Sequence, residues 1–156
     1  MKNELRQELT RRLCECNNGG LVLVMYDIYF AYSDDVKNAL AADDRAALKK
    51  SVGDAQAALD ELIGALDFKY PIAGQLYPLY SYCKRLLSTA LYGKNPAAVK
   101  EADGIMLKLR HSFEVAAEQD NSAPVMENAQ KVYAGMTYGR STLNENYIDD
   151  HRGFLA

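Results

Sequence analysis

Apolar residues recur at alternating steps of three and four in four long stretches of the chain, and turn residues separate these stretches. This spacing places the apolar side chains of each stretch on one face of an α-helix. The predicted stripes are Leu21, Met25, Ile28, Tyr32 and Val36; then Leu48, Val52, Ala55, Leu59, Leu62 and Leu66; then Ile72, Leu76, Leu79, Cys83, Leu86 and Ala90; and finally Val99, Ala102, Met106, Leu109, Phe113 and Ala116. Four such helices can enclose one shared core.

Capping residues predict the limits of the first two long helices. The first is expected over about residues 21–42, where an asparagine precedes it and a short polar turn follows. Asp43 or Asp44 can cap the second helix, which is expected to run to about residue 67. Connections this short favour antiparallel neighbours.

Proline and glycine mark the other two long helices. Since the residue before Pro71 is pushed out of helical geometry, the third helix is expected over about residues 72–92. Pro78 lies inside it, where a missing N–H should kink or delay the first turns. Gly93 is predicted to be a left-handed stop, and Asn95 followed by Pro96 to open the fourth helix, which continues to about residue 119.

Shorter apolar patterns flank the four long helices. Residues 3–14 carry only Leu5, Leu9 and Leu13 as an apolar stripe. A second short helix is expected to open near Pro124, with its apolar positions at Val125, Ala129, Val132, Tyr133 and Met136. No period continues beyond residue 136.

These elements predict an all-α fold, an antiparallel four-helix up-down bundle with a short extra helix at each terminus. One helical-bundle domain is expected over residues 1–136, with its core in residues 20–119. Residues 137–156 are expected to form a flexible tail.

Some side chains exceed what a four-helix core needs. Leu23, Tyr26 and Phe30 form a second apolar face on the first long helix, which either the chain's own terminal helix or a partner could cover. Tyr77 and Tyr80 lie beside the stripe of the third helix, and they either fill the flanks of the core or face a partner. The residues predicted to contact a partner helix are Leu23, Tyr26, Phe30, Ala47, Ala58, Tyr77 and Tyr80.

Ala47 and Ala58 are included because small side chains let another helix approach closely, although ordinary helix propensity explains alanine equally well.

Composition narrows the function. The 156 residues carry a net charge of -3 without a basic run, which argues against nucleic-acid binding. The most apolar stretch, residues 21–32, contains Asp27 and is shorter than the ~20 residues that span a bilayer, so no membrane insertion is expected. No export signal is visible at the N-terminus, and Cys14, Cys16 and Cys83 are expected to be reduced, which together predict a cytoplasmic protein.

The residues offer little catalytic chemistry. The positions three before His111 and His151 are not glutamates, which excludes a carboxylate-bridged dimetal bundle. Cys14 and Cys16 could hold a metal with His111, but no second ligand pair stands at zinc spacing, and unremarkable thiols are the better interpretation. No enzyme activity, metal or cofactor is predicted.

Three segments resemble the flagellin-specific export chaperones, the FliS family. Residues 21–27 read LVLVMYD and resemble the family's Leu-x-x-(Leu/Met)-Tyr-(Asp/Asn) run. Residues 72–82 read IAGQLYPLYSY and resemble its Ala-x-x-Leu-x-x-Leu-Tyr-x-Tyr segment, which Arg85-Leu86-Leu87 follows. The segment from Glu101 to Phe113 resembles its last bundle helix, so the resemblance covers about residues 20–118.

The resemblance implies a cytosolic chaperone that binds the C-terminal helices of flagellin, prevents premature polymerisation and delivers the subunit for export without a cofactor. It leaves a flagellar anti-sigma factor and an export-gate protein open as further partners. The alternative from the residues alone is a self-associating structural or regulatory adaptor whose second apolar face forms a homodimer.

Overall fold

The computed structural model describes residues 3–125, and this part of the chain is all-helical, as predicted. Its helices are α1 (Asn3–Glu15), α2 (Asn18–Ala41), α3 (Arg45–Gly64), α4 (Pro71–Gly93) and α5 (Pro96–Ala117). The short helix predicted near the C-terminus and the predicted tail over residues 137–156 lie outside the described residues, apart from residues 124–125, which are not helical.

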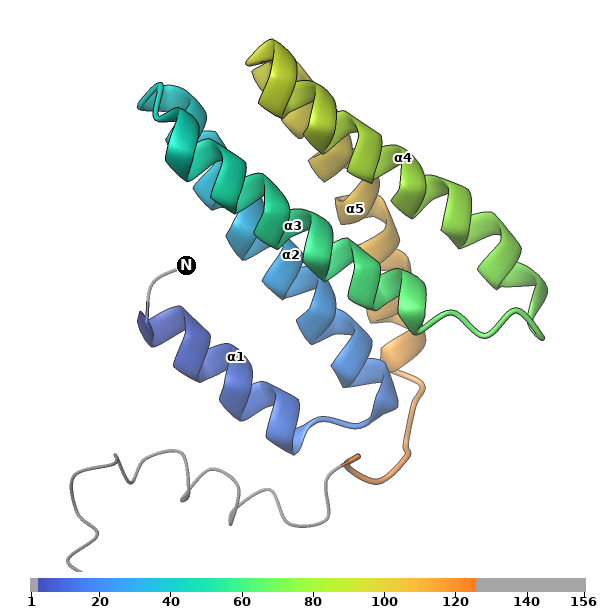
Figure 1. Cartoon of the computed structure of the whole chain (residues 1–156). Coiled ribbons are helices and arrows are strands. Elements are labelled where there is room, and N and C mark those ends of the chain that lie inside the picture. The colour runs from blue at the N-terminus through green and yellow to red at the C-terminus, as the bar shows by residue number, and fades with distance from the viewer. Residues whose placement is uncertain (1–2, 126–156) are drawn as a thin grey trace, which may run out of the picture.

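The four long helices pack around a shared core. α2 packs against both α3 and α5, and α4 also packs against both of them, so that each long helix has two long neighbours. α1 contacts α2 alone among the described helices and lies on the outside of this group (Figure 1). Within residues 3–125, each helix is too short or too polar to span a lipid bilayer.

Side-chain caps set the starts of three helices. The Asn17 side chain accepts a hydrogen bond from the Gly20 amide at 2.9 Å, so α2 begins three residues earlier than predicted. Asp44 caps α3 and Asn95 caps α5, and both caps confirm the sequence prediction. α4 begins at Pro71 without a side-chain cap, and the delay expected from Pro78 does not occur because the helix runs through it.

The predicted left-handed stop at Gly93 is wrong. Gly93 is the last helical residue, so the reversal falls on Lys94, which has a φ of 46°. Asp43, in the turn between α2 and α3, has a φ of 52°. These two residues form an ion pair with each other, which brings the two turns together and offsets part of the cost of their backbone conformation.

The predicted stripes match the core closely in α3 and less well elsewhere. Every predicted position from Leu48 to Leu62 is buried, whereas Ile72 and Leu79 of α4 are exposed. In α2 the fully buried residues are Val24, Tyr26, Tyr29, Ser33 and Val36, and four of the five predicted stripe residues are only half-buried. The core-facing side of α2 is therefore rotated relative to the prediction.

Candidate functional site: an apolar cavity at one end of the bundle

The two ends of the bundle differ in how they are closed. The turn end consists of residues 42–44 and 94–95, which the Asp43–Lys94 ion pair joins. At the opposite end, the cavity end, an apolar cavity of about 720 Å³ opens between the start of α2, the end of α3, the start of α4 and the end of α5. Its lining residues are Asn18, Val22, Met25, Leu62, Ala65, Leu66, Asp67, Tyr70, Ile72, Ala73, Leu76, Tyr80 and Phe113.

Aromatic side chains form one wall of the cavity. Tyr80 lines it, and its hydroxyl shares a 2.7 Å hydrogen bond with the hydroxyl of Tyr26, which lies behind it in the core. The Phe113 ring also lines the cavity, with its centroid 5.7 Å from that of Tyr26. Burial raises the pKa of both tyrosines, so this wall stays uncharged and suits an apolar ligand.

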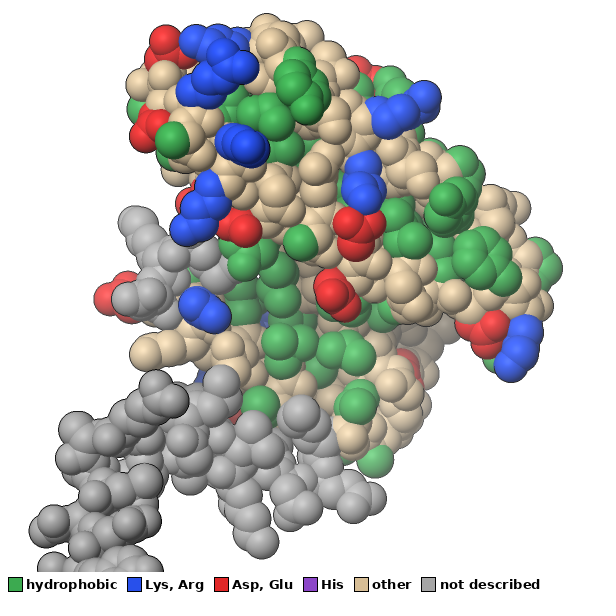
Figure 2. Space-filling model, in the orientation of Figure 1, with side chains coloured by type: hydrophobic (Ala, Val, Ile, Leu, Met, Phe, Trp, Pro, Cys, Tyr) green, Lys and Arg blue, Asp and Glu red, His purple; other side chains and the backbone are tan. Residues whose placement is uncertain are grey.

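Exposed aromatic side chains continue from the mouth of the cavity. Tyr70 and Ile72 line it and are 64% and 56% exposed. The ring of Phe68 packs edge-on against Tyr77, with centroids 6.1 Å apart, and both side chains are exposed. Figure 2 shows apolar side chains over α4 and a second apolar band between α1 and α3. The cavity end of the molecule thus exposes several large apolar side chains around the mouth of the cavity.

A hydrogen-bonded clamp fixes the chain beside the cavity. The Asn17 side-chain amide donates to the backbone oxygen of Asp120 at 2.9 Å, and the Gly19 amide donates to the Asp120 carboxylate at 2.9 Å. Hydrogen bonds from Ser122 and then from Gly19 lower the pKa of Asp120. The ionised carboxylate of Asp120 therefore stabilises the start of α2, because the first amides of a helix have no hydrogen-bond acceptor within the helix.

α1 covers the second face of α2. Leu9 and Cys14 of α1 and Val24 and Ala31 of α2 are buried. A hollow of about 240 Å³ lies at the edge of this contact, and its lining residues are Arg12, Glu15, Cys16, Gly20, Leu23 and Val24. Of the second apolar face predicted for α2, only Leu23 lies beside α1, whereas Tyr26 belongs to the core and Phe30 packs against it.

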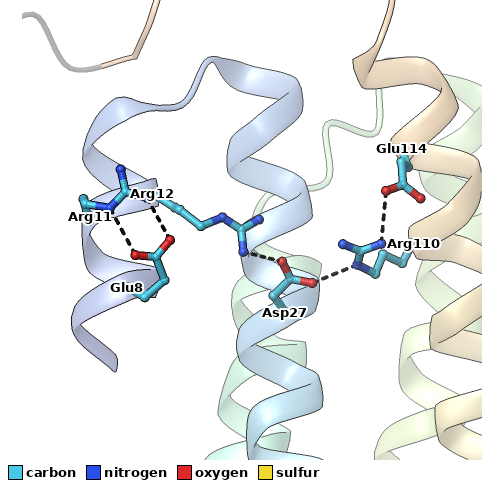
Figure 3. A network of polar contacts seen from close by, with 6 residues as sticks. All are labelled: Glu8, Arg11, Arg12, Asp27, Arg110 and Glu114. Atoms are coloured by element: carbon cyan, nitrogen blue, oxygen red, sulfur yellow. Dashed lines mark hydrogen bonds and ion pairs between the residues drawn. The ribbon is translucent and has the colours of Figure 1, made fainter. Parts of the chain in front are cut away.

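One carboxylate joins three helices at this contact. Asp27 of α2 pairs with Arg12 of α1 at 2.8 Å and with Arg110 of α5 at 2.8 Å (Figure 3). The hydrogen bond from Arg110 to Asp27 raises the pKa of the guanidinium. α1 is therefore held by a charged contact as well as by apolar packing.

A polar cluster that the sequence reading missed aligns α2 with α5. The Asp103 carboxylate accepts hydrogen bonds from Ser33 at 2.6 Å and Tyr29 at 3.2 Å, and Lys37 pairs with it at 3.0 Å. Ser33 and Tyr29 are fully buried. The signal that could have revealed this cluster is a Tyr-x-x-x-Ser-x-x-x-Lys spacing, which places all three side chains on one helical face.

The structure separates the residues predicted to contact a partner. Tyr80 lines the cavity and Tyr77 lies near its mouth, whereas Tyr26 is wholly buried behind Tyr80. Leu23 lines the hollow beside α1, and Phe30 is half-buried with its ring edge-on to Tyr29.

The two alanines of that set lie inside the bundle rather than on a free flank. Ala58 is buried in the core and Ala47 packs against it.

The cysteines show no reactive arrangement. Cys14 and Cys83 are buried free thiols and Cys16 is half-buried. Burial raises the pKa of the Cys83 thiol to about 12, so it stays protonated. In the described part of the chain, no three histidine, cysteine, aspartate or glutamate residues are arranged to hold a metal ion.

Comparison of the sequence with known protein families gives a match that covers most of the chain. Residues 1–120 match the family described as Flagellar protein FliS. The chain belongs to the FliS family. FliS proteins are flagellar export chaperones that bind flagellin. No curated protein matches the sequence.

Proposed function

We propose that this chain is a flagellar secretion chaperone that binds the C-terminal helices of flagellin in the cytosol, prevents their premature polymerisation and delivers the subunit for export. The observation that carries the proposal is the apolar cavity at the cavity end, in a chain of the FliS family. Amphipathic helices are recognised by grooves that accept their apolar anchors.

In this proposal, the long helices act as an antiparallel four-helix up-down bundle, with a short extra helix at each terminus. The closely packed core behind the cavity supports the side chains that line it. Apolar side chains of a client helix would enter between Leu66, Ile72 and Phe113, which line the cavity, and reach Tyr80 at its wall. Tyr77 and Phe68 would extend the contact outside its mouth.

A second client contact would form where α1 meets α2. Leu23 lines a hollow there, so a further client helix would reach Leu23, and the half-buried Phe30 would contribute only through its exposed part. Tyr26 would act indirectly, because its hydroxyl holds Tyr80. Tyr26→Ser would consequently test folding rather than binding.

A titration with a purified C-terminal segment of flagellin tests the site. Ile72→Asp places a carboxylate in the cavity lining. We expect the affinity for the flagellin segment to fall at least about tenfold, because the apolar side chains of flagellin would have to displace the water that hydrates this carboxylate. Leu107→Asp is the matched control, since Leu107 is 59% exposed and lies outside the lining. Equal affinities for the two variants would remove the cavity from the site.

The mass of the chain in solution separates this function from the homodimer alternative. A chaperone with a free cavity binds the flagellin segment as a monomer at the concentrations of the titration. A dimer that persists on dilution and binds no flagellin would instead support a self-associating adaptor.

A further inference from the structure

We propose that the apolar cavity selects a client helix that carries a basic side chain beside its apolar anchors, and that Asp67 receives this side chain. The inference rests on the function proposed above and adds to it the charge of the client segment. A segment whose flank is uncharged or acidic would bind more weakly than one with a lysine or arginine at this position.

The connection between α3 and α4 holds Asp67 at the cavity. Asp67 is the one charged residue that lines the cavity in the described part of the chain. Its Oδ1 accepts a hydrogen bond from the Lys69 amide at 3.0 Å, and its backbone oxygen accepts one from the Tyr70 amide at 3.0 Å. These two hydrogen bonds fold the connection around the carboxylate and fix its position at the lining.

The carboxylate of Asp67 has room for a cation. Within residues 3–125, its other oxygen, Oδ2, makes no hydrogen bond, and the carboxylate forms no ion pair. The side chain is exposed, so a partner can reach it. A client lysine or arginine could make a charge-assisted hydrogen bond to Oδ2 while its aliphatic stem lies on Leu66, the neighbouring lining residue.

Acidic residues near the cavity are placed against the helix dipoles. The C-terminal end of a helix carries partial negative charge, so a basic residue stabilises the last turn and an acidic residue destabilises it. α3 and α5 both end beside the cavity, and neither has a basic residue in its last turn. Glu61 and Glu114 lie there instead, and Glu114 shares Arg110 with Asp27. Helix stability does not explain these acids, whereas attraction of a basic client does.

The same charges discriminate between possible occupants of the cavity. A purely apolar ligand would cover part of the Asp67 carboxylate without supplying a cation, which costs desolvation free energy. An acidic segment would meet like charges on Asp67, Glu61 and Glu114. An amphipathic helix with a basic flank is the occupant that suits both the apolar lining and its carboxylate.

Titration of the full chain with the purified C-terminal segment of flagellin tests the role of Asp67. Asp67→Asn keeps the size of the side chain and an acceptor for the Lys69 amide, but removes the negative charge. We expect the affinity to fall about three- to tenfold at about 0.1 M salt, and by less at about 1 M salt, where the charges are screened.

Asp54→Asn is the matched control, because it removes the same charge from the middle of α3. Ten residues separate Asp54 from Gly64, the end of the helix, which is about 15 Å along its axis. This distance exceeds the screening length of about 10 Å at 0.1 M salt, so the affinity should stay within about twofold of the unaltered chain.

The basic partner of Asp67 is identified by changing the flagellin segment. Each lysine and arginine of the segment is replaced in turn by glutamine, and each version is titrated against the unaltered chain and against Asp67→Asn. One replacement should weaken binding to the unaltered chain and leave binding to Asp67→Asn unchanged. A glutamate at the same position of the segment should bind Asp67→Lys more tightly than it binds the unaltered chain.

The outcomes separate this inference from the proposed function. A segment that binds Ile72→Asp weakly, but binds Asp67→Asn as tightly as the unaltered chain, would keep the cavity as the client site and overturn the selection by charge. The absence of coupling between Asp67 and every basic residue of the segment would also overturn it. A segment that does not bind the unaltered chain at all would overturn the proposed function, and this inference with it.

Discussion

At the turn end, residues 42–44 and 94–95 connect the long helices in three and two residues, respectively, whereas at the cavity end residues 65–70 leave aromatic side chains in solvent. Side chains cap both helices that start at the turn end, and an ion pair joins its turns. At the cavity end α4 begins without a side-chain cap, and an apolar cavity stays open. The bundle thus joins its turns by an ion pair at one end and leaves an apolar cavity open at the other, where the cap of Asn17 and the Asp120 clamp hold the start of α2.

The largest expected effect is on the free energy of unfolding, when a leucine at either end of the bundle is replaced by alanine. Leu48, near the turn end, is 2% exposed, so Leu48→Ala should cost about 2–5 kcal/mol of unfolding free energy. Leu66 is half-buried in the cavity lining, and Leu66→Ala should cost about 1 kcal/mol or less. Urea denaturation measures both, and equal losses would contradict the comparison.

The hydroxyl pair behind the cavity gives a second test. Tyr80→Phe leaves the buried Tyr26 hydroxyl without its partner, which should cost about 1–3 kcal/mol. The double variant Tyr26→Phe/Tyr80→Phe should cost less than the sum of the two single changes, because it removes both hydroxyls. Additive losses in denaturation curves would mean that the pair contributes nothing as a unit.

A cap at the turn end should affect stability and leave binding alone. Asp44→Ala removes an acceptor from the Ala46 and Ala47 amides, with an expected cost of about 1 kcal/mol. Asp54→Ala is the control, since it lies within the same helix and caps nothing. Thermal denaturation should separate the two variants, and weaker flagellin binding by Asp44→Ala would break the division between the ends.

The smallest expected effect is the pH response of the clamp. Because the pKa of Asp120 is lowered in the folded chain, the contribution of the clamp is present above the ordinary aspartate pKa near about 4 and is lost as pH falls through the lowered value. Hydrogen exchange of the Gly19 amide should accelerate there. Asp120→Asn should abolish the pH dependence of this exchange rate. If the exchange rate of the Gly19 amide in this variant still changed with pH in the same way, another titrating group would be responsible.

The sequence predicted most of the fold because helix starts depend on local chemistry. Asp44, Asn95 and Pro96 mark their helices through side-chain caps and a missing N–H, which act within one turn. In α2 the apolar residues surround the helix, because the core lies on one side and α1 on the other, so periodicity could not select the buried face. Tyr26 and Ser33 are buried through specific hydrogen bonds that no hydropathy pattern records.

The cavity was harder to foresee for a geometric reason. Its lining comes from the ends of four helices, and residues such as Leu62 and Phe113 carry the same pattern as core residues farther along their helices. Only Tyr80 among the predicted partner residues lines it. Whether an apolar position is buried or lines an opening depends on where the neighbouring helices stop.

The ion pair between the two turns also has a mechanical consequence. It joins the turn between α2 and α3 to the turn between α4 and α5, so the long helices are linked at this extremity. α4 has 23 residues and is about 34 Å long, so a tilt of about 5° about the linked extremity corresponds to a displacement of about 3 Å at its far tip. The width of the mouth therefore depends far more steeply on the inclination of the long helices than does the spacing of the side chains beside the linked turns.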